Sequence, residues 1–124
     1  MPWPRHELRL YGHRGSSARL PENTLVAFRQ ALDDGATALE LDVQRTADGH
    51  LVVAHDPDGR RMAGASGLIR DLALSEVKRW NVAAGFRDGG GSSHAIPTLD
   101  EVLESFPGVP ISVAPMHEDS RSVP

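Results

Sequence analysis

Five side chains in this sequence, those of His13, Arg14, Glu40, Asp42 and His55, are of the types that phosphoryl chemistry uses. A guanidinium group can bind two phosphate oxygens at once, and two carboxylates can hold a hard divalent cation such as Ca²⁺ or Mg²⁺. Two imidazoles, whose ordinary pKa values lie near neutrality, can serve as a proton donor and a proton acceptor. Hydrolysis of a phosphodiester needs all three functions, because the leaving alkoxide must be protonated while the phosphoryl charge is neutralised.

The two carboxylates are expected on one face of a β-strand. Apolar and polar residues alternate from Ala38 to Val43, which is the period of a strand with one buried face. Glu40 and Asp42 then lie on the polar face, about 6–7 Å apart. His13 and Arg14 follow a short apolar segment that stops at Gly12, so they are expected at the end of another strand.

A hairpin is expected to bring His55 to the carboxylates. The sequence Thr46-Ala47-Asp48-Gly49 is a turn signal, and the apolar run from Leu51 to Ala54 follows it. The connection is too short for a parallel crossover, so the two strands are predicted to pair antiparallel. If the turn centres near Asp48-Gly49, His55 lies roughly opposite Asp42, and opposite partners share a face about 5 Å apart.

Two helices and a further strand are expected around these segments. Apolar residues recur at helical spacing between Asn23, a possible N-cap, and Gly35, where the helix is expected to end. The sequence Thr98-Leu99-Asp100-Glu101 fits a capping box and predicts a helix that stops by Pro107. Residues 109–113 are expected to form another strand.

The expected domain organisation is a single partial α/β domain over residues 1–113. Residues 58–96 are rich in glycine and weakly patterned, with one short helix expected around Ser75 to Trp80, and this region is interpreted as an insertion. The polar stretch 114–124 contains two prolines and no periodic pattern, so it is expected to be a disordered tail.

Composition excludes several classes of function. The 124 residues include 13 Lys+Arg against 17 Asp+Glu, a net charge of -4 that provides no basic footprint for nucleic acid. Cysteine is absent, which excludes disulfides, thiolate zinc sites and cysteine nucleophiles. No apolar run approaches the roughly 20 residues of a membrane helix, and the first ten residues do not resemble a signal peptide. A soluble, cytoplasmic protein is therefore expected.

Each candidate site residue also has an ordinary structural interpretation. A single His-Arg-Gly is typical of a surface loop, Glu40 and Asp42 alone are typical of a solvated strand face, and His55-Asp56-Pro57 alone is typical of a turn. Ser16 and Ser17 are near His13, but they lack the nucleophile elbow of a serine hydrolase. The combination of these features is far more specific than any one of them.

The segment from Gly12 to Pro57 closely resembles the opening of the glycerophosphodiester phosphodiesterase family. Four elements of that family occur in order and at the expected spacing, and a later helix motif also matches, at Pro97 to Val102. The four elements are His-Arg-Gly at 13–15, Pro-Glu-Asn-Thr at 21–24, Glu-x-Asp at 40–42 and His-Asp at 55–56.

This resemblance implies the N-terminal portion of a (β/α)₈ TIM barrel of the phospholipase C-like phosphodiesterase type. It implies catalytic histidines at His13 and His55, a phosphate-binding Arg14, and ligation of a divalent cation, Ca²⁺ or Mg²⁺, by Glu40 and Asp42. The implied substrates are small glycerophosphodiesters, cleaved to an alcohol and glycerol 3-phosphate. The attacking nucleophile is either water or the glycerol hydroxyl of the substrate.

The resemblance weakens after residue 113. The family carries a glutamate that completes the metal site and a lysine that faces the phosphate, and Ala114 and Met116 stand at those positions here. A (β/α)₈ barrel usually needs about 250 residues, so the chain is expected to be truncated, with an open sheet edge and poor stability. Two alternatives to the active hydrolase follow: an inactive remnant that acts as an interaction fragment, and a related two-histidine phospholipase.

Overall fold

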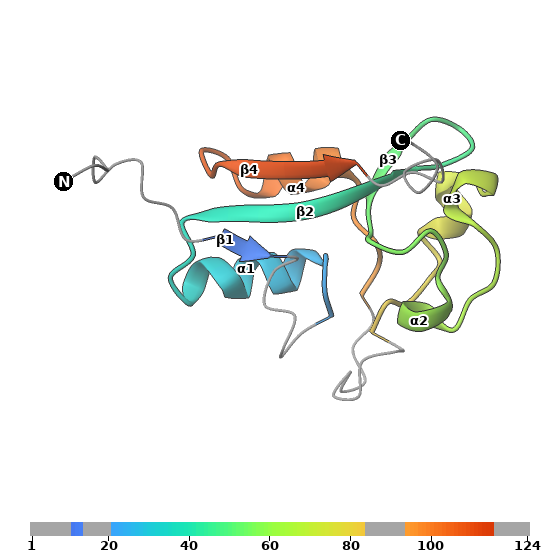
Figure 1. The fold of residues 1–124 in the computed structure, drawn as a ribbon, viewed down its shortest axis with the longest axis horizontal. Coiled ribbons are helices and arrows are strands. Elements are labelled where there is room, and N and C mark those ends of the chain that lie inside the picture. The colour runs from blue at the N-terminus through green and yellow to red at the C-terminus, as the bar shows by residue number, and fades with distance from the viewer. Residues whose placement is uncertain (1–10, 14–20, 84–93, 116–124) are drawn as a thin grey trace, which may run out of the picture.

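The computed structural model describes the backbone of residues 11–13 and, with their side chains, residues 21–83 and 94–115. One helix lies between the first two strands in the chain, and a series of helical elements lies between the third strand and the fourth (Figure 1). The elements are β1 (Tyr11–His13), α1 (Leu25–Asp33), β2 (Ala38–Arg45), β3 (Leu51–Val53), α2 (Arg60–Ala63), the 3₁₀ turn η2 (Ile69–Asp71), α3 (Leu74–Val77), α4 (Leu99–Ser105) and β4 (Ile111–Pro115).

Strand β2 is the centre of a four-stranded sheet. Its residue Leu39 pairs in parallel with Gly12 of β1 and with Ile111 of β4, so these two strands flank β2 on opposite edges (Figure 1). Strand β3 pairs antiparallel with the other end of β2, where Val43 faces Val53. The sheet thus consists of three parallel strands and one short antiparallel strand, and helices α1 and α4 precede β2 and β4 in the chain, as crossover helices do.

Helix α1 begins one residue later than the sequence predicts. Its N-cap is Thr24, whose hydroxyl accepts a hydrogen bond from the backbone amide of Ala27 at 3.2 Å. The prediction that Asn23 caps this helix is therefore wrong, because Asn23 has φ of 57° and lies before the cap. The predicted end of the helix is confirmed: Asp34 is the C-cap, and Gly35 takes φ of 113°, a left-handed conformation that glycine adopts readily.

The main hydrophobic core lies between the sheet and helices α1 and α4. Phe28 of α1 is fully buried, and its ring meets the ring of Phe106 edge to face at a centroid distance of 6.5 Å. The capping box predicted for α4 is present, with the Thr98 hydroxyl bound to the Glu101 amide and the Glu101 carboxylate bound to the Thr98 amide. The core residues contributed by the sheet are Leu39, Leu41, Val43 and Val53.

The packing of these apolar side chains determines which face of β2 is polar. Leu39 and Leu41 are buried against the helices, and successive side chains of a strand alternate between its two faces. Glu40, Asp42 and Gln44 therefore lie on the face of the sheet that the two helices leave open. The alternation of the sequence predicted this arrangement.

The hairpin of β2 and β3 is antiparallel, as predicted, but its register differs by one residue. The turn closes with the Thr46 amide bound to the His50 carbonyl at 2.9 Å. Because Val43 pairs with Val53, the residue opposite Asp42 is Ala54, whose amide donates to the Asp42 carbonyl at 2.9 Å. The prediction that His55 lies opposite Asp42 is thus wrong, since the turn centres on Asp48 rather than between Asp48 and Gly49.

The described parts of the segment 58–96, residues 58–83 and 94–96, have more regular structure than their weak pattern indicates. They contain α2, η2 and α3, of which only α3 overlaps the helix expected around Ser75 to Trp80. A second hydrophobic cluster joins them to the hairpin, with the buried residues Val52, Ile69, Val77, Val82 and Ile96. In Figure 1 this region lies beyond the carboxyl ends of the parallel strands.

Strand β4 begins and ends two residues later than predicted, at Ile111 and Pro115. The expected tail therefore starts with two strand residues, and its remainder, 116–124, lies outside the described residues. Among the helices that the structure describes, none is both long and apolar enough to cross a membrane.

Candidate active site

The carboxylates of Glu40 and Asp42 are the centre of the candidate site. Asp42 is buried, with 6% of its surface exposed, and Glu40 is half-buried. The amide nitrogen of Asn23 donates a long hydrogen bond of 3.4 Å to Oδ2 of Asp42. This contact ties the segment before α1 to the polar face of β2.

Asn23 is buried and has an incomplete set of hydrogen bonds. Its exposed fraction is 3%, and its Oδ1 atom has no hydrogen-bond partner among the residues that the structure describes. A buried carbonyl oxygen without a partner is costly, and such atoms mark places where an ion or water completes the structure. Amide and carboxylate oxygens are ligand types that suit Ca²⁺ or Mg²⁺, so the chemistry of Asn23, Glu40 and Asp42 fits a divalent cation.

The described residues do not contain a complete protein cage for a metal. No group of three or more His, Asp or Glu side chains is arranged there to hold an ion. The register of the sheet places Ala114 of β4 beside Asp42 on the neighbouring strand. A methyl group thus lies at the position where the family resemblance implies a third carboxylate.

His55 lies just beyond the end of β3 and is held from two sides. Gln44, on the same face of β2 as the carboxylates, donates from Nε2 to the His55 carbonyl at 2.8 Å. The imidazole Nδ1 lies 3.1 Å from Oδ1 of Asp56, and the side chain of His55 remains 35% exposed. Because an ionised carboxylate only accepts hydrogen bonds, this contact requires a proton on Nδ1 and directs Nε2 elsewhere.

Asp56 is in turn bound by Arg61 of α2, and Arg61 also binds Glu22. Arg61 donates from Nε to Oδ2 of Asp56 at 2.9 Å, and from Nη1 and Nη2 to the two oxygens of Glu22 at 3.1 and 3.0 Å. The hydrogen bonds to Glu22 and then to Asp56 raise the pKa of Arg61 above its ordinary value. Partial burial by itself would raise the pKa of Asp56. The hydrogen bonds from Arg61 and His55 have the larger combined effect, so this pKa lies below its ordinary value.

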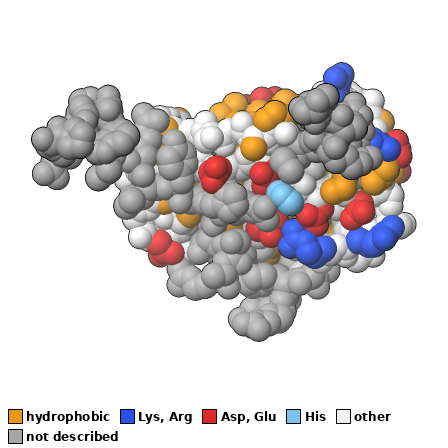
Figure 2. Space-filling model, in the orientation of Figure 1, with side chains coloured by type: hydrophobic (Ala, Val, Ile, Leu, Met, Phe, Trp, Pro, Cys, Tyr) orange, Lys and Arg blue, Asp and Glu red, His pale blue; other side chains and the backbone are white. Residues whose placement is uncertain are grey.

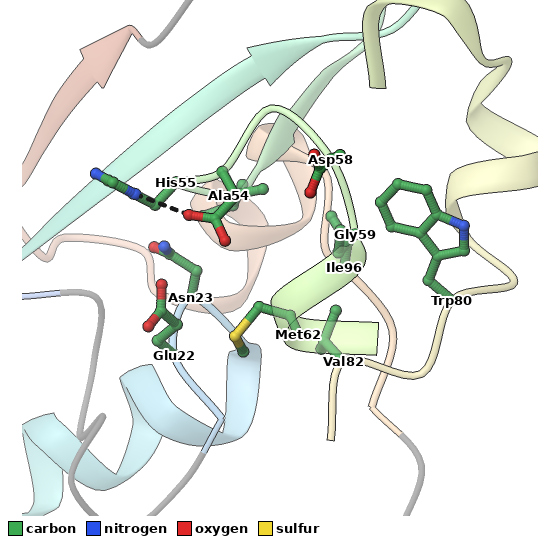
Figure 3. A pocket seen from close by; sticks show the side chains of 12 residues that line it. Glu22, Asn23, Ala54, His55, Asp58, Gly59, Met62, Trp80, Val82 and Ile96 are labelled. Carbon is green, nitrogen blue, oxygen red and sulfur yellow. Dashed lines mark hydrogen bonds and ion pairs between the residues drawn. The ribbon is translucent and has the colours of Figure 1, made fainter. Parts of the chain in front are cut away.

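Glu22, Asn23, His55 and Asp56 line a pocket at the boundary between the sheet and the segment that follows β3, whereas Glu40, Asp42 and Arg61 are not among its lining residues. Glu22 and Asn23 lie on the same side of it as His55, whereas Trp80 lies on the far side of Gly59 (Figure 3). The remaining wall is largely apolar, with Met62, Val82 and Ile96 among its residues. In the space-filling view, acidic side chains surround a histidine with basic side chains close by (Figure 2).

The other predicted site residues are only partly described. The backbone of His13 pairs with Glu40 in the parallel register of β1 and β2. The backbone of His13 therefore lies on the strand next to the one that carries the two carboxylates. Arg14 and Met116 lie outside the described residues. Of the five predicted residues, Glu40 and Asp42 thus share the open face of β2, and His55 follows the end of β3, where its carbonyl binds Gln44.

Sequence reasoning missed three contributors to this site. Gln44 continues the polar alternation of β2 after Glu40 and Asp42, so the pattern did contain a signal for it. Glu22 lies in the Pro-Glu-Asn-Thr motif, but its contact with Arg61 carried no signal, because the two residues are separated by 39 positions and meet only in the folded chain.

Comparisons with known proteins agree with the sequence pattern. Residues 13–122 match the profile of the Glycerophosphoryl diester phosphodiesterase family. The chain is 45% identical over 92 residues to a glycerophosphodiester phosphodiesterase from Caldanaerobacter subterraneus, and 42% identical over 101 residues to glycerophosphodiester phosphodiesterase 1 from Mus musculus. These alignments cover 74% and 81% of the chain, but only 37% and 30% of the two relatives.

Solved structures give the same result for the fold. A glycerophosphodiester phosphodiesterase from Agrobacterium tumefaciens matches with a TM-score of 0.82 and 32% identity, over 86% of this chain and 46% of that one. A phosphodiesterase from Oleispira antarctica, solved with the product sn-glycerol-3-phosphate, matches with a TM-score of 0.79 and 31% identity, over 89% and 45%. The described fold therefore corresponds to a little under half of these enzymes, and the chain belongs to the glycerophosphoryl diester phosphodiesterase family.

Proposed function

We propose that this chain carries the part of a phosphodiesterase active site that hydrolyses glycerophosphodiesters to an alcohol and glycerol 3-phosphate. The observation that carries the proposal is the buried Asp42, next to Glu40 on the open face of β2, with His55 held at the same end of the sheet by Gln44. The product bound in the Oleispira antarctica relative supports a small glycerol phosphate ligand.

In the proposed reaction, the residues of this chain bind phosphate and move protons. Arg14 binds the phosphoryl oxygens, and His13 and His55 act as the proton donor and acceptor, each contributing about 10²–10⁴-fold to the rate. Glu40 and Asp42 would hold a divalent cation, and the buried Asn23 oxygen is a further candidate ligand. When bound, such a cation supplies positive charge to the phosphate and acidifies the attacking hydroxyl.

The same proposal treats β1, β2 and β4 as part of the wall of a (β/α)₈ barrel. Parallel strands with crossover helices on a single face support this assignment, because a barrel has helices outside and its active site at the carboxyl ends of the strands. His13 and His55 are both at that end of the sheet. Residues 58–96 would then be an insertion beside the active site.

A second candidate function is an inactive interaction fragment. It is favoured by Ala114, which pairs with Asp42. Its methyl group cannot bind a cation, so the proposed metal site lacks a third carboxylate ligand. The same alignment of strands that supports a metal site thus also indicates why this chain would hold a cation weakly.

One assay separates the two candidates. The purified chain is incubated with glycerophosphocholine and CaCl₂ or MgCl₂, and the release of glycerol 3-phosphate is measured with and without EDTA. The hydrolase proposal predicts turnover that EDTA abolishes and that His55→Ala lowers about 10²-fold or more. The matched control is His50→Ala, since the His50 side chain is 53% exposed in the turn after β2. A folded but inert protein would support the interaction fragment.

A further inference from the structure

The ionic contacts of Arg61 connect three segments that are distant in sequence. Glu22 precedes α1, Asp56 follows β3, and Arg61 lies on α2 within residues 58–96. The guanidinium makes four hydrogen bonds to these two carboxylates, between 2.9 and 3.3 Å. Such two-pronged contacts restrict orientation more strongly than a single ion pair does.

Helix α2 is itself held firmly, so the position of Arg61 is defined. A Cβ atom at Gly59 would come within 2.7 Å of the Trp80 ring, which means that the start of α2 packs directly on the indole. Met62 packs against the second hydrophobic cluster, and the Ile69 amide donates to the Pro57 carbonyl at 2.8 Å. The backbone on both sides of Arg61 is therefore anchored independently of its side-chain contacts.

Asp56 lies between this anchored arginine and the imidazole of His55. Its Oδ1 accepts from His55 Nδ1 at 3.1 Å and from Arg61 Nη2 at 3.3 Å, and its Oδ2 accepts from Arg61 Nε. With both oxygens oriented by Arg61, Asp56 cannot rotate away from the imidazole without losing these bonds. In a neutral histidine, the hydrogen bond made by one ring nitrogen determines which of the two nitrogens carries the proton.

We propose that Arg61 is a positioning residue for His55: by holding Asp56 against Nδ1, it fixes the proton on that nitrogen and leaves Nε2 to exchange protons with the substrate. The inference extends the proposed function and depends on it only for the role of Nε2. It gives residues 58–96 a task in the reaction, because α2 brings Arg61 to the histidine.

The test measures the tautomer of His55 directly. In the whole chain labelled with ¹⁵N, the imidazole nitrogen shifts are recorded at a pH above the titration of histidine, where the two neutral tautomers are distinguished. We expect Nδ1–H to dominate in the wild type and to lose its dominance in Arg61→Ala. Arg61→Met, which keeps an aliphatic stem but no guanidinium, decides the test if Arg61→Ala does not fold.

Arg60→Ala is the matched control, because Arg60 is an exposed arginine of the same helix. It removes the same charge, and we expect the His55 tautomer to stay as in the wild type. A folded Arg61 variant in which Nδ1–H still dominates would overturn the inference. If the tautomer changes in the Arg61 variants but turnover of an active chain does not, the positioning stands and the catalytic role proposed for His55 is wrong.

Discussion

Asn23 combines a left-handed backbone with a buried side chain, and both features follow from its residue type. Asparagine accepts φ near +57° at lower cost than most residues because its short amide can bond locally. The same amide reaches Asp42 from this position and presents Oδ1 to the site. The Pro-Glu-Asn-Thr segment thus does more than start α1, since Glu22 binds Arg61 and Asn23 binds Asp42.

The backbone and side-chain contributions of Asn23 can be separated by two substitutions. Asn23→Ala and Asn23→Gly both remove the amide, but only glycine accepts a left-handed conformation without strain. We expect Asn23→Ala to lower the free energy of unfolding by about 1 kcal/mol more than Asn23→Gly. Urea denaturation followed by circular dichroism measures the difference. Equal stability of the two variants would contradict the assigned backbone strain.

The register of strands β2 and β4 determines which residues border the proposed cation site. The pairing of Asp42 with Ala114 puts these two residues side by side on parallel strands. Val113, the preceding residue of β4, pairs with Leu41 and therefore belongs to the opposite face. A change of one position along β4 thus decides whether a carboxylate reaches the site.

The substitution Ala114→Glu is expected to strengthen binding of Ca²⁺. It adds a third carboxylate beside Glu40 and Asp42, and affinity for this ion rises with the number of charged ligands. We expect the Kd to fall about tenfold or more, which corresponds to about 1.4 kcal/mol. Isothermal titration calorimetry measures it, with Val113→Glu as the control of equal charge on the opposite face. Equal Kd values for the two variants would contradict the proposed position of the cation site beside Asp42.

On the scale of the whole molecule, several large apolar side chains remain exposed at the surface. Val113 of β4 is 39% exposed and Leu103 of α4 is 48% exposed. Within the described part of the chain, β4 pairs with β2 along one edge only. An edge strand with an exposed apolar residue is a template for pairing with another chain.

We therefore expect the purified chain to associate at high concentration through β4. Val113→Lys is expected to reduce this association, because a charge on an edge strand opposes pairing. Light scattering coupled to size-exclusion chromatography measures the mass over a range of concentrations. Leu103→Lys provides the matched control on a helix surface. If both variants reduce association equally, general surface hydrophobicity is the cause and not the strand edge.

Local sequence patterns were sufficient to predict the polar face of β2 and the antiparallel hairpin that follows it. Alternation along β2 put Glu40 and Asp42 on the face opposite Leu39 and Leu41, and the turn before His50 predicted an antiparallel hairpin. These predictions succeeded because strand period and turn preference are local properties, set by residues close in sequence. The helix cap and the hairpin register each differed by one residue, since neighbouring polar residues compete for such positions.

The contacts between these elements could not be predicted from local patterns. The contact of Asn23 with Asp42 and the bonds of Arg61 to Glu22 and Asp56 join residues from separate elements. The second hydrophobic cluster likewise draws on residues from Val52 to Ile96, so α2, η2 and α3 are held in place by burial and not by a local period. A local pattern reports which face of an element is polar, whereas the partner that meets that face depends on how the whole chain packs.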